Sequence, residues 1–330
     1  MINFLSFNLI TAILFGGGYL FSNKYNRDYS FFDRTHTTII KGIGALLVLW
    51  GHVALSNGIK GVQFIAGAGV SLFLICSGYG IEESFKKNGL KSFWKNRIIK
   101  VIIPYYIICF AGYIIQNVNQ LSIRGLVRIL DFESQWYINY ILINYVIFYA
   151  LSRICKDNKR LLYIGIAYSI WFILDSLFFA SISAPFLRAR QMWAFLLGII
   201  VSHKKEGTEI VFGKWLFIFV NLFLGLGMML YTNTSFVKAL PIILSNFLSL
   251  FTVVPLACAV IGFTLKCKLL FRNYSILLSG KVSYEIFLIH SNCLSLCSGN
   301  IMLVPLFMLV VFGGSFIFNN VYNHQLERIQ

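Results

Sequence analysis

A lysine and a histidine lie at the two ends of one apolar run, KGIGALLVLWGH, which extends from Lys41 to His52. On a helix this step of eleven residues corresponds to about 16 Å and about three turns, so both side chains share one face. A groove with a cation at one mouth and a histidine deep inside suits a long anionic ligand. Two simpler interpretations stay open, because Lys41 can extend its charge to the membrane surface and His52 can bond to a backbone carbonyl.

A second group of ionisable residues occurs in LSGKVSYEIFLIH, residues 278–290. Lys281 and Glu285 are four residues apart, which predicts a pair on one helix face. His290 follows Lys281 by nine residues, which places it deep in the outer half of its span, at a height similar to that of His52. Ionisable groups inside a span are costly and indicate functional sites. We therefore expect the two histidines to share a site.

A pair of cations precedes a proline in NRIIKVIIPYY. Arg97 and Lys100 are three residues apart, so they are neighbours on one helix face, an arrangement that suits phosphate groups. The alternative is ordinary positive charge at the cytoplasmic end of a span. Pro104 is predicted to kink or break the helix that follows.

The elements that must position these residues are membrane helices. The 330-residue chain is 58% hydrophobic and only 12% charged, whereas soluble domains are about one quarter charged, so aqueous soluble classes are excluded. A bilayer needs about 20 apolar residues per helix. Eleven runs meet this requirement and predict an all-α polytopic membrane protein: 3–21, 37–56, 62–82, 98–117, 135–154, 161–180, 186–202, 214–231, 238–264, 276–297 and 301–320. The segments between them are too short for a second soluble domain.

The net charge of +16 is interpreted as membrane topology rather than as nucleic-acid binding. With the N-terminus outside, the inner loops hold 20 Lys and Arg residues and the outer loops hold six, as the positive-inside rule requires. This predicts a multi-pass plasma-membrane protein with a cytoplasmic C-terminus. The seven cysteines form no C-x-x-C pair, so neither a disulfide framework nor a metal site is expected.

Six motifs in order resemble the acyltransferase-3 family of polytopic membrane acyltransferases, especially its sugar O-acetylase branch. Lys41-x10-His52 is similar to the opening motif of the family, in which many members carry Arg first. Ser71 stands where the family usually has Asp. The motifs are Lys41 to His52, Gly69 to Tyr79, the basic pair with Pro104, Gln135-Trp136-Tyr137, Phe195 to Gly198, and Ser283 to His290.

This resemblance implies a ten-helix core in a single membrane domain over residues 1–330, with 1–36 as an extra N-terminal helix and loop. No soluble esterase-like domain is expected, so transfer would finish in the membrane domain or on a separate partner acyltransferase. The implied reaction moves an acyl group, most often acetyl, from cytoplasmic acetyl-CoA to a sugar hydroxyl of a surface glycan or its lipid-linked precursor.

The same resemblance implies roles for individual residues. His52 would be the general base or the acyl carrier, with Lys41 beside it in the catalytic groove, and His290 would bind the acceptor or orient His52. The expected CoA-binding residues are Lys41, Ser77, Arg97 and Lys100, and the expected acceptor-binding residues are Trp136, Tyr137, Glu285 and His290.

Two other functions are considered for a chain with eleven spans. A transporter or flippase of a lipid-linked sugar would need no thioester chemistry, so consumption of acetyl-CoA would distinguish it. A glycosyltransferase of the lipid-sugar type is disfavoured, because the first outer loop, 57–61, is short and holds no acidic residue.

Overall fold

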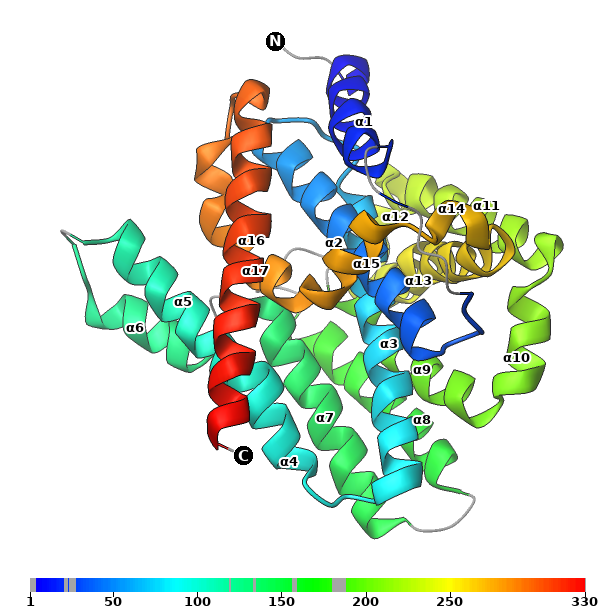
Figure 1. Ribbon diagram of the computed structural model, residues 1–330. Helices are drawn as coiled ribbons and strands as arrows, with labels where there is room; N and C mark the ends of the chain where they lie inside the picture. The colour runs from blue at the N-terminus through cyan, green and yellow to red at the C-terminus, as the bar shows by residue number, and fades with distance from the viewer. Residues whose placement is uncertain are drawn as a thin grey trace.

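The computed structural model describes residues 4–20, 23, 28–118, 120–132, 135–155, 159–179 and 188–329, and its regular elements are helices (Figure 1). The α-helices are α1 (Phe4–Leu20), α2 (Arg34–Ser56), α3 (Phe64–Asn88), α4 (Phe93–Arg97), α5 (Ile103–Gln116), α6 (Ile123–Leu130), α7 (Trp136–Ile154), α8 (Arg160–Leu174), α9 (Ala194–His203), α10 (Lys205–Phe212), α11 (Trp215–Thr232), α12 (Ser235–Ala239), α13 (Ile242–Lys266), α14 (Lys268–Phe271), α15 (Tyr274–Lys281), α16 (Ser283–Cys293) and α17 (Val304–Ile329). Two π-helical segments cover Ile98–Ile102 and Asp175–Phe179, and three short 3₁₀ turns cover Ala189–Gln191, Leu294–Leu296 and Ile301–Leu303.

Within the described residues, seven helical segments are long and apolar enough to cross a membrane: Arg34–Ser56, Phe64–Asn88, Phe93–Gln116, Arg160–Phe178, Trp215–Thr232, Ile242–Lys266 and Ile301–Glu327. They correspond to seven of the eleven predicted runs and confirm the all-α class. The other four runs contain shorter or more polar helices, namely α1, α7, α9 and the pair α15 and α16. The predicted number of eleven spans therefore stays a prediction. Three of the 20 Lys and Arg residues of the predicted inner loops, Lys24, Arg27 and Lys156, lie outside the described residues.

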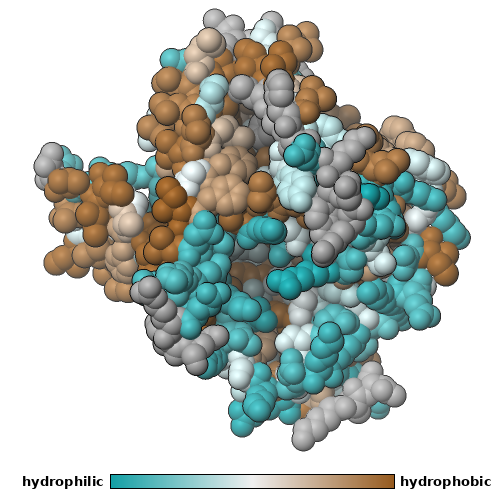
Figure 2. Space-filling view, in the orientation of Figure 1, coloured by the Kyte–Doolittle hydropathy of each residue, from teal (hydrophilic) through white to brown (hydrophobic). Residues whose placement is uncertain are grey.

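The spanning helices differ in how much of their surface other helices cover. In α2, α3 and α13 more than half of the apolar window is buried, whereas in α11 only 17% is buried. Exposed side chains of α11 include Leu216 and Phe223, which is the arrangement expected of helices that face lipid tails. Figure 2 shows a similar hydrophobic surface over α5 and α6, and hydrophilic residues gathered around a hollow near the middle of the view.

Asp33 fixes where α2 begins. Its carboxylate accepts a hydrogen bond from the backbone N–H of His36 at 2.7 Å, which satisfies one of the free donors of the first turn. From Arg34 to Ser56 the helix is uninterrupted. Lys41 and His52 therefore keep the spacing that places them on one face.

Glycines let α3 and α9 pack with their backbones in contact. A Cβ on Gly78 would lie 2.0 Å from the carbonyl oxygen of Phe195, and a Cβ on Gly198 would lie 2.1 Å from that of Ile75. Any larger residue at these positions would force the two helices apart. Gly78 and Gly198, each from one of the six sequence motifs, therefore set the distance between α3 and α9.

A second pair of glycines brings α15 against α2. A Cβ on Gly42 would lie 2.1 Å from a carbonyl oxygen of α15, and a Cβ on Gly280 would lie 1.9 Å from one of α2. The neighbours of these glycines in the chain are Lys41 and Lys281. The close packing therefore brings two lysines from distant parts of the sequence to one region.

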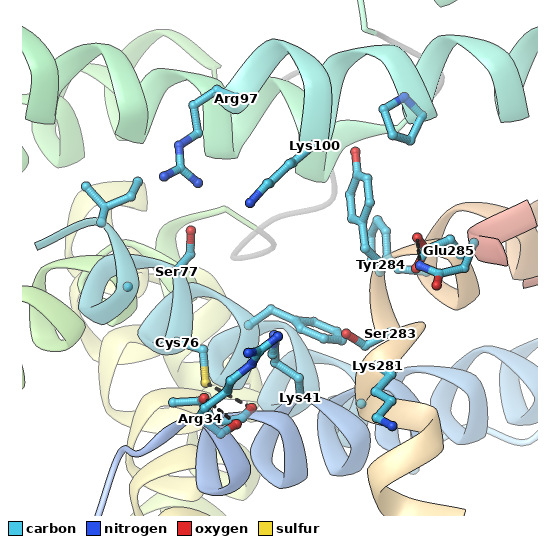
Figure 3. A pocket seen from close by; sticks show the side chains of 18 of the residues that line it. Arg34, Lys41, Cys76, Ser77, Arg97, Lys100, Lys281, Ser283, Tyr284 and Glu285 are labelled. Carbon is cyan, nitrogen blue, oxygen red and sulfur yellow. Dashed lines mark hydrogen bonds between the residues drawn. The ribbon is translucent and has the colours of Figure 1, made fainter. Parts of the chain in front are cut away.

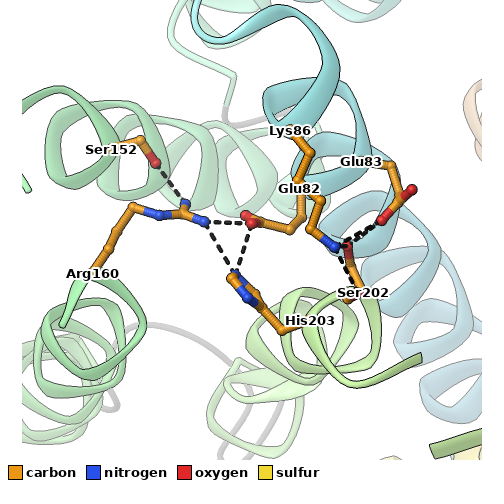
Figure 4. Close-up of polar contacts among 7 residues, drawn as sticks. All are labelled: Glu82, Glu83, Lys86, Ser152, Arg160, Ser202 and His203. Carbon is orange, nitrogen blue, oxygen red and sulfur yellow. Dashed lines mark hydrogen bonds and ion pairs between the residues drawn. The ribbon is translucent and has the colours of Figure 1, made fainter. Parts of the chain in front are cut away.

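A buried ion-pair cluster joins α3, α7, α8 and α9 (Figure 4). Arg160 pairs with the fully buried Glu82, and its guanidinium also donates to Ser152 at 2.9 Å and lies 3.2 Å from the ring of His203. Breaking a buried pair of this kind strands a charge in a medium that cannot solvate it. The cluster therefore fixes the ends of four helices relative to one another.

The segment predicted as one span at 276–297 is broken. α15 ends at Lys281, α16 begins at Ser283, and Val282 between them is non-helical. The predicted pair of Lys281 and Glu285 is wrong, because the break removes the continuous helix that it needs. Glu285 accepts a hydrogen bond from the amide of Asn319 in α17 at 2.8 Å instead.

Candidate active site

Two cavities lie on either side of the middle of α16. The basic cavity has a volume of about 650 Å³ and is lined by five cationic side chains: Arg34, Lys41, Arg97, Lys100 and Lys281. The histidine cavity has a volume of about 670 Å³, and its lining includes His52, Trp136, Arg190 and Gln191. Both volumes are in the range of small-molecule sites.

The basic cavity carries a strong excess of positive charge. None of its five cations forms an ion pair with any described residue. Among the described lining residues Glu285 is the single acidic side chain, and it is engaged by Asn319. In Figure 3, Arg97 and Lys100 point into the space that separates their helix from Cys76 and Lys41. Cations gathered without counter-charges are suited to a polyanionic ligand.

Arg97 is held by aromatic rings rather than by acids. Its guanidinium carbon lies 5.5 Å from the ring centre of Phe93 and 5.3 Å from that of Tyr145, which are cation–π distances. Tyr145 is positioned by Ser77, whose hydroxyl lies 3.2 Å from the phenol oxygen. The buried Nε of Arg97 has no hydrogen-bond partner among the described residues. Its donors are therefore available to a ligand, and the planar fork matches the geometry of phosphate.

A π-helical segment, Ile98–Ile102, carries Lys100 and connects α4 to α5. Two tyrosines from other helices bind its backbone carbonyls: Tyr284 donates to the carbonyl of Val101 and Tyr322 to that of Ile99, each at 2.7 Å. Segments of this kind are rare and often occur at functional sites. Pro104 does not end the helix, since helical structure continues from Phe93 to Gln116, but it directly follows the π-helical departure from regular α-helix.

His52 and His290 form a hydrogen-bonded pair. Nδ1 of His52 lies 2.7 Å from Nε2 of His290, and Nδ1 of His290 lies 3.1 Å from the carbonyl oxygen of Ile286. A carbonyl can only accept, so in the neutral pair Nδ1–H of His290 donates to Ile286 and Nε2 of His290 accepts from Nδ1–H of His52. This order of donors leaves Nε2 of His52 with a free lone pair. The arrangement gives one imidazole that lines the histidine cavity and a second, buried one that fixes its tautomer.

The rest of the histidine cavity is polar at one end. Gln191 accepts a hydrogen bond from the buried Ser71 at 2.5 Å and donates to the carbonyl of Gly67 at 3.1 Å. Arg190 supplies a cationic side chain to the same lining. Trp136 supplies an aromatic surface to the same cavity. Such a lining can bind a polar ring with hydroxyl groups.

Comparison with family models finds one that covers most of this architecture. The model of an acyltransferase domain, acyltransferase 3, matches residues 37–320. The chain belongs to the acyltransferase-3 family. Comparisons with curated proteins and with solved structures give no significant match. The matched residues include the catalytic candidates Lys41 and His52, one in each cavity, and do not include α1.

All four predicted donor-binding residues of the acyltransferase line the basic cavity: Lys41, Ser77, Arg97 and Lys100. His52 lines the histidine cavity, at the other end of α2 from Lys41. His290 is 1% exposed and contacts His52 directly. The roles assigned to these residues stay predictions.

The predicted acceptor residues of the acyltransferase are separated by the fold. Trp136 lines the histidine cavity, but the side chain of Tyr137 lines the basic cavity, as does that of Glu285. Adjacent residues on a helix point about 100° apart, so a single sequence motif can serve two cavities. The sequence motif alone gave no means of separating them.

The sequence analysis assigned no role to Phe287, Tyr284 or Tyr322, although the first two lie within the motif Ser283 to His290. Phe287 carried a usable signal, because it precedes His290 by three residues and therefore lies on the same helix face. Tyr322 carried none, since its partner Ile99 is 223 residues away in the chain.

Proposed function

We propose that this acyltransferase is an O-acetyltransferase of the plasma membrane. It takes an acetyl group from acetyl-CoA in the basic cavity, on the cytoplasmic side, and transfers it to a sugar hydroxyl in the histidine cavity, on the outer side. The acceptor is a cell-surface glycan or its lipid-linked precursor. The observation that carries this proposal is that five cations without an ion-pair partner among the described residues line one cavity, while a hydrogen-bonded histidine pair lies at the next.

The donor end is supported by charge and by topology. CoA is a polyanion made in the cytoplasm, and the loops at the end of α2 that carries Lys41 are those with the excess of Lys and Arg, the cytoplasmic side by the positive-inside rule. Arg97 binds phosphate through its planar fork, while Lys41 and Lys100 act as point charges. The N-terminus is then outside and the C-terminus in the cytoplasm.

The chemistry is centred on Nε2 of His52. In one route the imidazole removes the proton of the acceptor hydroxyl, whose oxygen forms a bond to the thioester carbon. The carbon–sulfur bond breaks, and the CoA thiolate takes up the proton from the imidazolium. In the other route Nε2 itself attacks the thioester, CoA leaves as the thiolate, and the acyl-imidazole then transfers its acyl group to the hydroxyl, whose proton passes to the released imidazole.

His290 serves both routes in the same way. By accepting the hydrogen bond from Nδ1–H of His52 it keeps the lone pair at Nε2, where it lines the histidine cavity. It also stabilises the positive charge that develops on His52 in either route. His290 is therefore a positioning residue, and Trp136, Arg190 and Gln191 are the acceptor-binding residues of this proposal.

The test uses the purified protein in liposomes with radiolabelled acetyl-CoA. Free CoA and protein-bound label are measured for the wild type, for His52→Ala, and for His324→Ala, an exposed histidine of α17 that lines neither cavity. We expect CoA release by the wild type and by His324→Ala, and none by His52→Ala.

Full activity of His52→Ala would refute the mechanism. Label that stays on the wild-type protein but not on His52→Ala would select the acyl-imidazole route. If no CoA is released with any of a panel of lipid-linked and soluble glycans, acetyl transfer is refuted and transport of a lipid-linked sugar becomes the better explanation.

A further inference from the structure

A cluster of three aromatic rings lies where the two cavities meet, because Phe73 and Tyr137 line the basic cavity and Phe287 lines both. The ring centre of Phe287 lies 4.7 Å from that of Tyr137 and 6.3 Å from that of Phe73. All three side chains are buried, with exposed fractions of 5%, 7% and 8%. Rings at these distances are in direct contact. The three residues therefore form one layer of rings in which Phe287 contacts both of the others.

The position of this layer follows from which residue lines which cavity. On α3, Val70 lines the histidine cavity, whereas Phe73, almost one turn later, lines the basic cavity. On α7, Trp136 lines the histidine cavity and Tyr137 the basic cavity. Two helices thus change from one cavity to the other at the level of the ring cluster.

Phe287 occupies the centre of this layer. Among the described residues it alone lines both cavities. Its ring centre also lies 5.6 Å from that of His290, so the layer borders directly on the histidine pair. A thioester in the basic cavity and the free nitrogen of His52 are therefore on opposite sides of this one side chain.

We propose that Phe287 is a movable partition that determines which acyl groups reach His52. The inference rests on the proposed function, since it assumes a thioester donor in the basic cavity. A rotation of one side chain opens a narrow passage next to Tyr137 and Phe73, and short acyl groups cross it while longer ones collide with the ring. Phe287 is thus a specificity-determining residue, and it also keeps the two cavities from forming one continuous aqueous path.

The first experiment measures acyl-chain selectivity. CoA release is followed with acetyl-CoA, butyryl-CoA and hexanoyl-CoA for the wild type, Phe287→Leu and Phe287→Ala. Phe148→Leu is the matched control, because Phe148 is also fully buried among aromatic rings but lines neither cavity. We expect the wild type to prefer acetyl-CoA, and the two Phe287 variants to lower the acetyl-to-hexanoyl ratio of kcat/KM at least tenfold. Phe148→Leu should leave that ratio unchanged.

An unchanged ratio in both Phe287 variants would overturn the inference. If the wild type turns over none of the three thioesters, the proposed function fails instead, and the partition itself is decided by a second measurement that needs no activity.

That second measurement uses Cys76, a native cysteine that lines the basic cavity. Intact cells are treated with a small membrane-impermeant methanethiosulfonate, and modification of the Cys76 peptide is quantified by mass spectrometry. We expect Cys76 to be protected in the wild type and in Phe148→Leu, and to be modified in Phe287→Ala. Permeabilised cells, in which the reagent reaches both cavities, provide the control that Cys76 reacts in every variant. Equal modification of the wild type and Phe287→Ala in intact cells would refute a closed partition.

Discussion

Replacing Arg97 by Gln should weaken acetyl-CoA binding and leave the chemical step nearly intact. The guanidinium is held on the rings of Phe93 and Tyr145 and forms no ion pair with any described residue. Its donors therefore face the ligand already oriented, and little side-chain entropy is lost when a phosphate binds. Because the contact is the same in the ground and transition states, its loss appears in KM rather than in kcat.

The expected size follows from the contact that is lost. A hydrogen bond to a charged group contributes about 1.5–3 kcal/mol, which corresponds to a rise in KM of about 10- to 150-fold at about 1.4 kcal/mol per factor of ten. Arg97→Lys keeps the charge but loses the planar fork, so its KM should lie between those of the wild type and of Arg97→Gln.

The assay is the rate of CoA release as a function of acetyl-CoA concentration, at a saturating acceptor concentration. Lys95→Gln is the matched control, since Lys95 is an exposed cation of the same segment that does not line the basic cavity. Thermal unfolding of each purified variant shows whether the loss of the ring contacts has altered the fold. The reasoning is refuted if Arg97→Gln raises the KM of the acceptor alone, or if Lys95→Gln raises the KM of acetyl-CoA as much.

Two further predictions concern the histidine pair and the helix packing. His290→Leu should lower kcat about ten- to a hundredfold, because a buried donor left without its acceptor costs about 1–3 kcal/mol. His290→Gln keeps an amide oxygen that can accept from Nδ1–H of His52 and should retain more activity. Equal losses of steady-state kcat in the two variants would contradict the orienting role. Gly198→Val should prevent accumulation of folded protein, because its Cβ would lie 2.1 Å from a backbone oxygen of α3. The control Gly227→Val, at a position of α11 where a Cβ would meet no atom within 4 Å, should express normally. Fluorescence-detected size exclusion measures both variants, and normal elution of Gly198→Val would show that α3 and α9 can separate.

Part of the site could be predicted because it depends on positions along one helix. Lys41 and His52 lie on one uninterrupted helix, so helical periodicity alone gives their separation and shared face. This expectation holds whatever surrounds the helix. Arg97 and Lys100 also line one cavity, but Lys100 lies in a π-helical segment, so the α-helical spacing of the pair does not account for this.

Other parts of the site could not be predicted, because they depend on local departures from the regular helix. The break at Val282 and the π-helical segment Ile98–Ile102 each change the direction of the side chains that follow. The expected pair of Lys281 and Glu285 failed for this reason. Tyr137 lines the basic cavity rather than the histidine cavity because the packing of α7 decides which face meets which cavity.

The sequence by itself determined the class of the protein. An apolar composition with few charges excludes a water-covered surface, and the spacing of the ionisable residues indicates which helices line the two cavities, because both are properties of single segments. Only the tertiary structure decided that His52 bonds to His290, that five cations without an ion-pair partner among the described residues line one cavity, and that Phe287 lines both cavities. These are contacts between segments far apart in the chain, and they exist only once close glycine packing has fixed the helices against each other.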